Sequence, residues 1–305
     1  MTWSFTDSAA AFRAAAAAHL AAEPARNTAV LTLMDTAGRL GWWEEADGRV
    51  TGVVVVAPGG PSFGTMTEEA ARALALPMPQ EAARALASPG SQEPAGALAS
   101  PGTKFPEPKE PAGALAFPGA EEPTVVRGET TAVEAYAEAT GRPWTPTGRM
   151  RLFRLGEPAP PDPAPAGRAR LATEADVPLV AAWTRDFAVA IGDEPAEDYT
   201  GFVSERISEG RLWLWEAPEG HPVSMAAVSR TIEGQARVHL VYTPPAERGR
   251  GYAAGATDAV SRAALAAGVE QVLLFTDLAN PTSNALYQRL GYRPVTDHLS
   301  VRFTG

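Results

Sequence analysis

The sequence of 305 residues contains no cysteine. This absence excludes disulfide bonds, thiolate metal ligands and a cysteine nucleophile. Histidine is scarce as well. The four histidines, His19, His221, His239 and His298, include no pair at ligand spacing, so we expect no metal site.

Long apolar runs and a basic leader are missing too. The strongest apolar run, Val53 to Ala57, is far too short to span a bilayer, and Met1 to Asp7 has no basic region ahead of an apolar one. By default we expect a cytoplasmic protein without a membrane partner. The net charge is −10, and only two of the 26 basic residues are lysine. This acidic balance opposes non-specific binding to phosphate backbones, so we expect no nucleic-acid partner.

The length of the chain favours two domains over one compact core. The proline-rich run 157–165 is the clearest boundary, because proline at this density favours an extended linker. We therefore predict a first module over 1–155, a linker over 156–167 and a second domain over 168–305. Within the first module, segment 88–123 is rich in proline and glycine and contains a near-exact repeat. It has too little apolar surface to offset the entropy of ordering, so we predict a disordered insertion.

Periodicity and turn residues predict the elements of both parts. The first part has two helices within 5–40, broken near Pro24, and then a hairpin of two strands, 41–45 and 49–57, around the Asp47–Gly48 turn. A helix (67–87), a strand (124–128), a helix (131–140) and a strand (150–155) follow. The second part starts with a strand (168–172), two helices (174–191 and 196–208) and three strands (211–217, 222–230 and 236–243). A helix (252–267), a strand (271–276), a helix (281–290) and a last strand (292–303) follow. Antiparallel strands before a strand–helix–strand crossover argue against a simple doubly wound sheet.

The most informative segment joins the strand 236–243 to the helix that starts at Tyr252. Two prolines end the strand, and Arg248-Gly249-Arg250-Gly251 then opens the helix. A helix N-terminus leaves backbone N–H groups unpaired and carries a partial positive charge, which suits an anion. The glycines let a phosphate approach the backbone, and the arginines add charge. A loop that only turns the chain is the simpler alternative.

A dinucleotide site is a rival interpretation of the same glycines. Gly249-x-Gly251-x-x-Ala254 fits the dinucleotide fingerprint, and Asp277 follows on a later strand. However, the motif comes late in the chain, two prolines separate the strand from the glycines, and antiparallel hairpin strands precede it. These features disfavour a dinucleotide.

A second motif decides between these interpretations. Asn280 is a good N-cap, Pro281 fits the first helical position, and Gly291 fits the position after the helix. Here the chain resembles the GNAT superfamily of acyl-CoA-dependent N-acetyltransferases. Arg248-x-x-Gly251-x-Ala253 resembles the pyrophosphate motif of that family, and the segment from Asn280 through Tyr287 to Gly291 resembles its C-terminal helix. The resemblance spans 168–305.

The resemblance implies a role for each matching position, with acetyl-CoA as the co-substrate. Backbone groups of Val241 and Thr243 would pair with the pantetheine arm, and Asn280 would contact it in addition to capping its helix. Tyr287 would donate a proton to the departing thiolate. The pyrophosphate would be held by the amides of one loop: Arg248, Gly249, Arg250, Gly251, Tyr252 and Ala253.

The general base is the position where the chain departs from the family. Some members carry a carboxylate four residues before the first pantetheine contact, and here that position is Arg237. His239 lies on the same strand and, by alternation, on the same face, so we predict it as the substitute. A histidine satisfied by local hydrogen bonds is an equally open interpretation. Glu216 and Asp277 are weaker candidates.

The first part repeats the element order of the second. We therefore predict an α/β (α+β) fold of tandem GNAT-like modules, each a mixed, largely antiparallel sheet flanked by helices, similar in layout to mycothiol synthases. The strand ending at Ala57 would correspond to 236–243, and Pro58–Gly64 to the phosphate loop. Because Pro58–Gly64 contains no arginine, we expect a degenerate N-terminal module that binds no CoA.

The function implied by this resemblance is transfer of an acetyl group from acetyl-CoA directly to a primary amine of a small molecule. The acidic chain would favour a cationic acceptor through steering. A non-catalytic acyl-CoA-binding or sensing protein is an alternative, supported by the missing carboxylate. An aminoacyl-tRNA-dependent transferase is a third, which the acidic balance disfavours. The acceptor, the acyl preference and the oligomeric state are left open by the sequence.

Overall fold

The computed structural model describes residues 1–57, 59–75 and 123–304. The predicted insertion, 88–123, lies outside the described residues except for Pro123. The elements of the first half are β1 (Thr2–Thr6), α1 (Ala9–Ala22), α2 (Thr28–Leu33), β2 (Arg39–Glu44), β3 (Val50–Ala57), β4 (Gly60–Met66), α3 (Glu68–Ala75), β5 (Val125–Glu129), α5 (Thr130–Thr140) and β6 (Trp144–Leu155).

The elements of the second half follow the predicted order. They are β7 (Arg168–Leu171), a 3₁₀ turn (Glu174–Asp176), α6 (Val177–Ala190), α7 (Thr200–Ser208), β8 (Leu212–Glu216), β9 (Pro222–Val228), β10 (Gln235–Tyr242), a 3₁₀ turn (Pro245–Glu247), α8 (Tyr252–Ala266), β11 (Gln271–Asp277), α9 (Pro281–Arg289) and β12 (Tyr292–Phe303). In the first half the prediction missed β1 and β4. β1 is only five residues long, and its Trp3 and Phe5 are buried because it pairs with β2 and packs in one core with Ala70 of α3.

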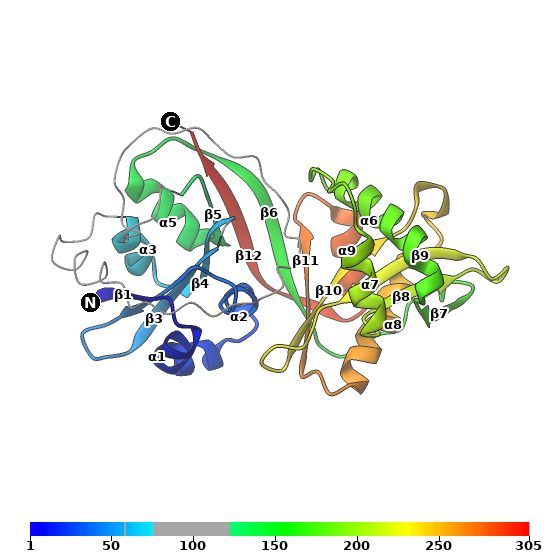
Figure 1. The fold of residues 1–305 in the computed structure, drawn as a ribbon, viewed down its shortest axis with the longest axis horizontal. Helices are drawn as coiled ribbons and strands as arrows, with labels where there is room; N and C mark the ends of the chain where they lie inside the picture. The colour runs from blue at the N-terminus through cyan, green and yellow to red at the C-terminus, as the bar shows by residue number, and fades with distance from the viewer. Residues whose placement is uncertain (58, 76–122, 305) are drawn as a thin grey trace.

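The described strands form one continuous sheet, in the order β1-β2-β3-β4-β5-β12-β6-β11-β10-β9-β8-β7. Each half is a mixed, largely antiparallel sheet flanked by helices, which confirms the predicted fold class (Figure 1). The two halves exchange their last strands. β6 lies between β11 and β12, and β12 lies between β6 and β5. The two long strands, green and red in Figure 1, therefore run through both halves. The predicted division at 156–167 stays a prediction, and the sheet continues across it.

Two hydrophobic cores cover opposite faces of the second half of the sheet. On one face, which we call the α8/α9 face, Val238 of β10 packs with Val260 of α8 and Tyr287 of α9. On the other, the α6/α7 face, Leu240 of β10 packs with Val180 of α6 and other buried residues. β10 therefore separates two environments.

One predicted correspondence between the halves is wrong. β4 is parallel to β5 just as β10 is parallel to β11, so β4 is the counterpart of β10. The predicted loop Pro58–Gly64 mostly belongs to this strand, because 60–66 pair with β3 in a tight hairpin. After β4 the helix α3 begins almost at once, with Glu68 and Glu69 in its first turn. Two carboxylates at a helix N-terminus repel phosphate, so we still expect no phosphate to bind in front of α3, although for a different reason from the one predicted.

None of the described helices has the length and apolar character needed to cross a membrane.

Candidate acyl-CoA site

A gap opens between β10 and β11 partway along their length. The two strands pair in parallel only from Gln235 to Val238 on β10, opposite Gln271 to Leu274 on β11. Beyond Leu274, β11 continues along β6 as far as Asp277, but β10 no longer pairs with β11. Backbone groups on that edge of β10 are therefore available to an extended ligand, which can pair there like an added strand.

A β-bulge causes the two strands to separate. Two residues, Leu240 and Val241, lie between the registered pairs His239↔Ala227 and Tyr242↔Met225. Leu240 has φ +50°, in the left-handed region that a branched side chain rarely adopts. Backbone strain of this kind costs of order 1–3 kcal/mol and is concentrated at functional sites. The bulge bends β10 and brings its end, with Val241 and Thr243, to the phosphate loop.

The loop after β10 presents a row of unpaired amides. Within the described part of the chain, the N–H groups of residues 249–254 donate to no backbone or side-chain acceptor. They lead into α8, a helix of 15 residues whose N-cap is Gly251. Gly249 and Gly251 have φ of +80° and +79°, and a Cβ on Gly249 would meet nothing within 4 Å. The loop is therefore an open cradle of N–H groups at a helix N-terminus, which fits a pyrophosphate.

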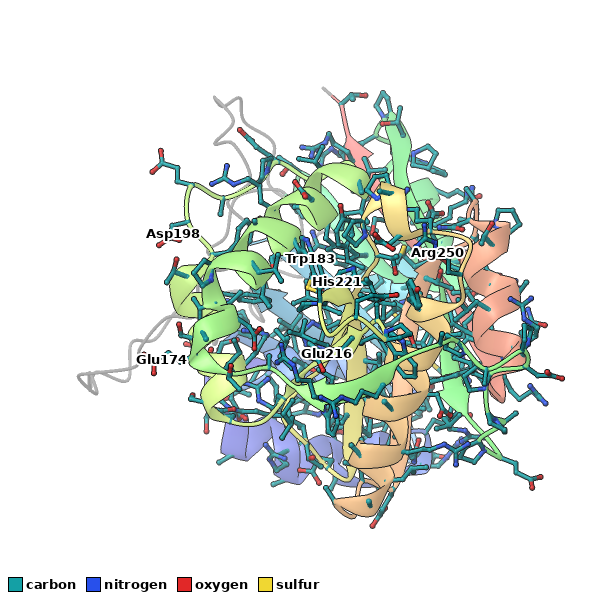
Figure 2. All side chains as sticks on the ribbon, turned by 90° about the vertical axis from the view of Figure 1, so that its right-hand side faces the viewer. Glu174, Trp183, Asp198, Glu216, His221 and Arg250 are labelled. Atoms are coloured by element: carbon teal, nitrogen blue, oxygen red, sulfur yellow. The ribbon has the colours of Figure 1, made fainter. Side chains whose placement is uncertain are left out.

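The two loop arginines are partly engaged within the loop. Arg248 Nε donates to the Thr243 carbonyl at 3.0 Å, and its amide donates to Pro245. Arg250, labelled in Figure 2, forms an ion pair of 2.9 Å with Glu247, and its side chain is exposed. Arg248 thus holds the loop in shape, and its amide is less available for phosphate than predicted. Arg250 keeps further N–H groups free for an anion.

The proline-rich linker is packed against this site. Trp215 Nε1 donates to the Ala166 carbonyl at 2.9 Å. A Cβ added to Gly255 of α8 would lie 2.7 Å from the Trp215 ring and 2.9 Å from Pro165. The same Pro165 lies 3.5 Å from the corresponding position on Gly251. The linker therefore forms part of the wall beside the phosphate loop.

On the α8/α9 face, α9 begins at the open end of β11. Asn280 Oδ1 accepts from Ser283 N at 3.0 Å, so the predicted N-cap is confirmed. Tyr287 is 8% exposed and packs edge-on against Tyr292 with ring centroids 6.0 Å apart. Burial raises the pKa of Tyr287 to about 12, so its hydroxyl stays protonated at neutral pH. The side chain can donate a proton but cannot act as a base.

His239 lies on the opposite face of the sheet from Tyr287. It alternates with Val238, whose side chain is on the α8/α9 face, and its charged neighbours are Arg206 of α7, Arg237 and Arg211. Burial, reinforced by these three cations, lowers the pKa of His239 to about 3. The imidazole is therefore neutral at physiological pH, and it is a weak base. The structure thus brings Tyr287 and His239 to opposite sides of β10.

The pKa of His239 predicts a pH-dependent stability. The group has a pKa of about 3 when folded and 6.5 as its ordinary value, so below pH 6.5 the unfolded chain binds a proton that the folded chain does not. The free energy of unfolding should therefore fall as the pH falls through this range. A His239→Asn variant lacks this contribution. Urea unfolding at pH 8 and 5.5 should show that it loses about 1 kcal/mol less than the wild type. Equal losses would mean that His239 is protonated in the folded state.

The weaker candidates for the base are engaged elsewhere. Glu216 is buried and accepts from Arg170 at 2.5 Å and from Arg168 at 3.2 Å. These guanidinium groups, Arg170 first, lower the pKa of Glu216 below its ordinary value, which makes it a poor proton acceptor. Asp277 is exposed and accepts from Ala279 N at 2.8 Å in the turn before α9.

Comparison with known proteins adds a match to a family model over part of the chain and a shared fold over nearly all of it. Residues 177–292, which include the phosphate loop and Tyr287, match the model of the Acetyltransferase (GNAT) family. No curated protein matches the sequence. Three solved structures share the fold over nearly the whole chain. They are a Drosophila protein (TM-score 0.61, 11% identity, 99% of this chain and 98% of that one), a GCN5-related N-acetyltransferase from Sphaerobacter thermophilus (0.59, 15%, 98% and 95%) and a GNAT-family acetyltransferase from Colwellia psychrerythraea (0.56, 11%, 99% and 99%).

Proposed function

Because residues 177–292 match the model of the acetyltransferase (GNAT) family, we propose that this chain transfers an acetyl group from acetyl-CoA to a primary amine of a small molecule. The observation that carries the proposal is the row of unpaired amides at residues 249–254, next to an open strand edge. The amides from Gly249 to Ala253 and the side chain of Arg250 hold the pyrophosphate. Val241 and Thr243 pair with the pantetheine arm through their backbone, and Asn280 contacts it from α9.

The positions of Tyr287 and His239 support a direct transfer. The amine nitrogen forms a bond to the thioester carbonyl carbon, and the C–S bond breaks. The nitrogen loses one proton, and the departing sulfur gains one. Tyr287, protonated on the α8/α9 face, supplies the proton to sulfur. On the other face the attacking nitrogen becomes strongly acidic once it is bonded to carbon, so a base as weak as His239, or water, can take its proton.

Release of free CoA thiol tests the function. Purified protein with acetyl-CoA and a panel of primary amines should release thiol only when a suitable amine is present, and an acetylated amine should appear in equal amount. Propionyl-CoA and longer acyl-CoAs in the same assay measure the acyl preference. Tight binding of acetyl-CoA without turnover on any amine would instead favour an acyl-CoA sensor, an alternative that Arg237 and the low pKa of His239 support.

A stoichiometry of one CoA per chain is a further prediction. In the first half, β4 leads directly into α3, where Glu68 and Glu69 occupy the first turn. These carboxylates repel a pyrophosphate, whereas the loop before α8 attracts one. Isothermal titration of the whole chain with CoA should therefore give one site. Two equivalents bound would contradict the assignment of the first half as a module without CoA.

A further inference from the structure

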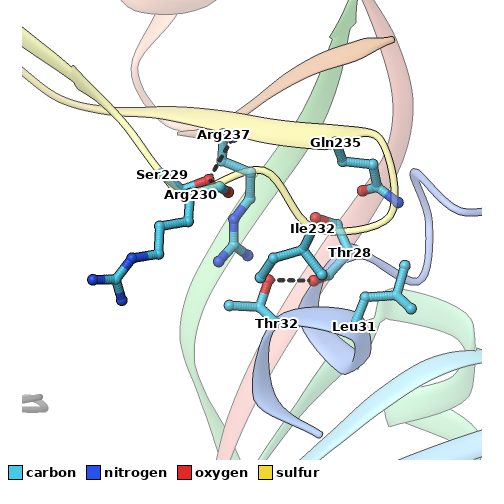
Figure 3. A pocket seen from close by; sticks show the side chains of 8 residues that line it. All are labelled: Thr28, Leu31, Thr32, Ser229, Arg230, Ile232, Gln235 and Arg237. Atoms are coloured by element: carbon cyan, nitrogen blue, oxygen red, sulfur yellow. Dashed lines mark hydrogen bonds between the residues drawn. The ribbon is translucent and has the colours of Figure 1, made fainter. Parts of the chain in front are cut away.

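A small hollow lies between the two halves of the chain, on the face of β10 that carries His239. The turn between β9 and β10 forms one side, and α2 of the first half forms the other (Figure 3). Ile232 of that turn packs against the core under α1 and α2, and Arg13 of α1 forms an ion pair with Glu233. These contacts fix the two sides relative to each other. The hollow is shallow and open to solvent, with room for about one water-sized group (about 10 Å³).

Arg237 points into this hollow without an anionic partner. Its backbone N–H donates to Ser229 Oγ at 2.9 Å, but its guanidinium makes no hydrogen bond or ion pair with any described residue. Burial lowers the pKa of Arg237, and no carboxylate opposes that effect. A cation removed from water without a partner costs several kcal/mol, so proteins rarely keep one without a use for it.

Gln235 lines the same hollow and is also unsatisfied. Its side chain is 3% exposed, and neither its Nε2 nor its Oε1 has a hydrogen-bond partner within the described chain. A buried amide left unpaired costs about 1–3 kcal/mol per group. Two costly groups, one cationic and one with N–H donors, thus line one small space. A bound oxyanion would satisfy Arg237, whereas the amide of Gln235 lies on the other side of Ile232 (Figure 3).

The hollow is next to the proposed reaction site. Gln235, Arg237 and His239 alternate along β10 and share one face. Arg237 and His239 are two residues apart, about 6.6 Å along a strand. The bulge that parts β10 from β11 begins immediately after His239. If a small molecule binds Arg237 through its oxyanion, an amine several bonds away in the same molecule would reach the position of the thioester.

We propose that Arg237 binds a carboxylate of the acetyl acceptor, which is therefore a small amino acid-like molecule with its amine held near His239. This inference rests on the proposed function. A carboxylate matches the single unpaired charge of Arg237 and accepts two parallel N–H bonds from a guanidinium. A phosphate dianion would need a second free cation, and the neighbouring Arg230 already pairs with Glu205 and Glu209. The local field thus opposes the cationic acceptor that the net charge of the chain favours.

Matched acceptors test the subsite through the rate. The series of ω-amino acids from glycine to 6-aminohexanoate is compared with alkylamines of the same length, using acetyl-CoA and thiol release. At least one amino acid should exceed its alkylamine in kcat/KM. Arg237→Met should remove that preference by about 30-fold or more, because loss of one partner of a buried charge pair costs 2–5 kcal/mol. The alkylamine rates of the same variant are the baseline, because Arg237 also lowers the pKa of His239 and that effect cancels in the ratio of the two rates. Arg237→Lys should retain part of the preference.

A stability measurement tests the subsite without turnover. Free Arg237→Met should melt at a higher temperature than the wild type, because the substitution removes an unpaired, partly buried charge. The preferred ω-amino acid should raise the melting temperature of the wild type and leave that of Arg237→Met unchanged. Arg72→Met, which removes an exposed arginine on α3, is the control and should respond like the wild type.

The outcomes separate the subsite from the function. Stabilisation by amino acids that depends on Arg237, without acetyl transfer to any amine, would refute the proposed function and support the subsite. Acetyl transfer with no preference for amino acids, and no stabilisation by any of them, would refute the subsite and leave the function standing. Unchanged preference in both Arg237 variants would also refute it.

Discussion

Replacing Tyr287 by phenylalanine should lower the turnover number by about 10²–10⁴-fold while leaving the affinity for CoA close to that of the wild type. The phenol is buried, and its pKa of about 12 keeps it protonated, so it is suited to donate to a departing thiolate. The tetrahedral intermediate can expel either the CoA sulfur or the attacking amine. Without a proton donor the sulfur leaves less readily, so the intermediate returns to reactants more often. Phenylalanine keeps the ring and removes only the donor. Stopped-flow acetyl transfer and titration calorimetry with CoA measure the two quantities.

Tyr292→Phe is the matched control. Its ring lies beside that of Tyr287, and its hydroxyl hydrogen-bonds to Ser261 Oγ at 2.7 Å in the core. Loss of this bond should cost about 1 kcal/mol of stability and leave turnover nearly unchanged. Unchanged turnover in Tyr287→Phe would reduce Tyr287 to a packing residue. A collapse of CoA affinity with a surviving rate would make its hydroxyl a binding contact, with water as the proton donor.

Replacing Gly251 by valine should weaken CoA binding by at least about 100-fold, since it removes several charge-assisted hydrogen bonds that are each worth roughly 1.5–3 kcal/mol. Gly251 has φ +79°, which a β-branched residue avoids, so the N-terminus of α8 would reorganise. The new side chain would also extend into the cradle that the pyrophosphate needs. Calorimetric titration with CoA measures the loss.

Gly268→Val separates binding from strain. Gly268 has φ +87° just after the other end of α8, and a Cβ there meets nothing within 4 Å. Both variants should lose similar stability in urea unfolding, of order 1–2 kcal/mol from the left-handed conformation. Only Gly251→Val should lose CoA. If Gly251→Val binds CoA normally while folded, the phosphate is held elsewhere.

The exchange of β6 and β12 has a consequence for the proposed site. β6 supplies the strand beside β11 in the second half, and its Phe153 packs in the same core as Tyr287. Ala25 of the first half packs against Leu273 of β11 on the opposite face. The first half is thus part of the framework that holds β11 and α9, even though its own loop is unsuited to a phosphate.

Local chemistry was readable from the sequence alone. Asn280 followed by Pro281 marks the start of α9, and Asp47–Gly48 marks the β2–β3 turn. Gly249 and Gly251 mark the loop that opens α8. Each of these signals acts within a few residues, through a cap, a fixed φ angle or a left-handed conformation, so the neighbouring residues contain the whole cause.

Only the tertiary structure decided the rest, because it depends on pairings between distant residues. The pattern of β6 and β12 permits pairing within either half, and their exchange follows from long-range registers such as Thr276↔Arg151 and Leu299↔Gly128. Likewise no local pattern announces the bulge at Leu240, which turns Leu240 to the same face of the sheet as His239. The unpaired charge of Arg237 is also a tertiary property. Whether an arginine has a partner depends on what the rest of the chain brings within about 4 Å, and here α2 brings no carboxylate.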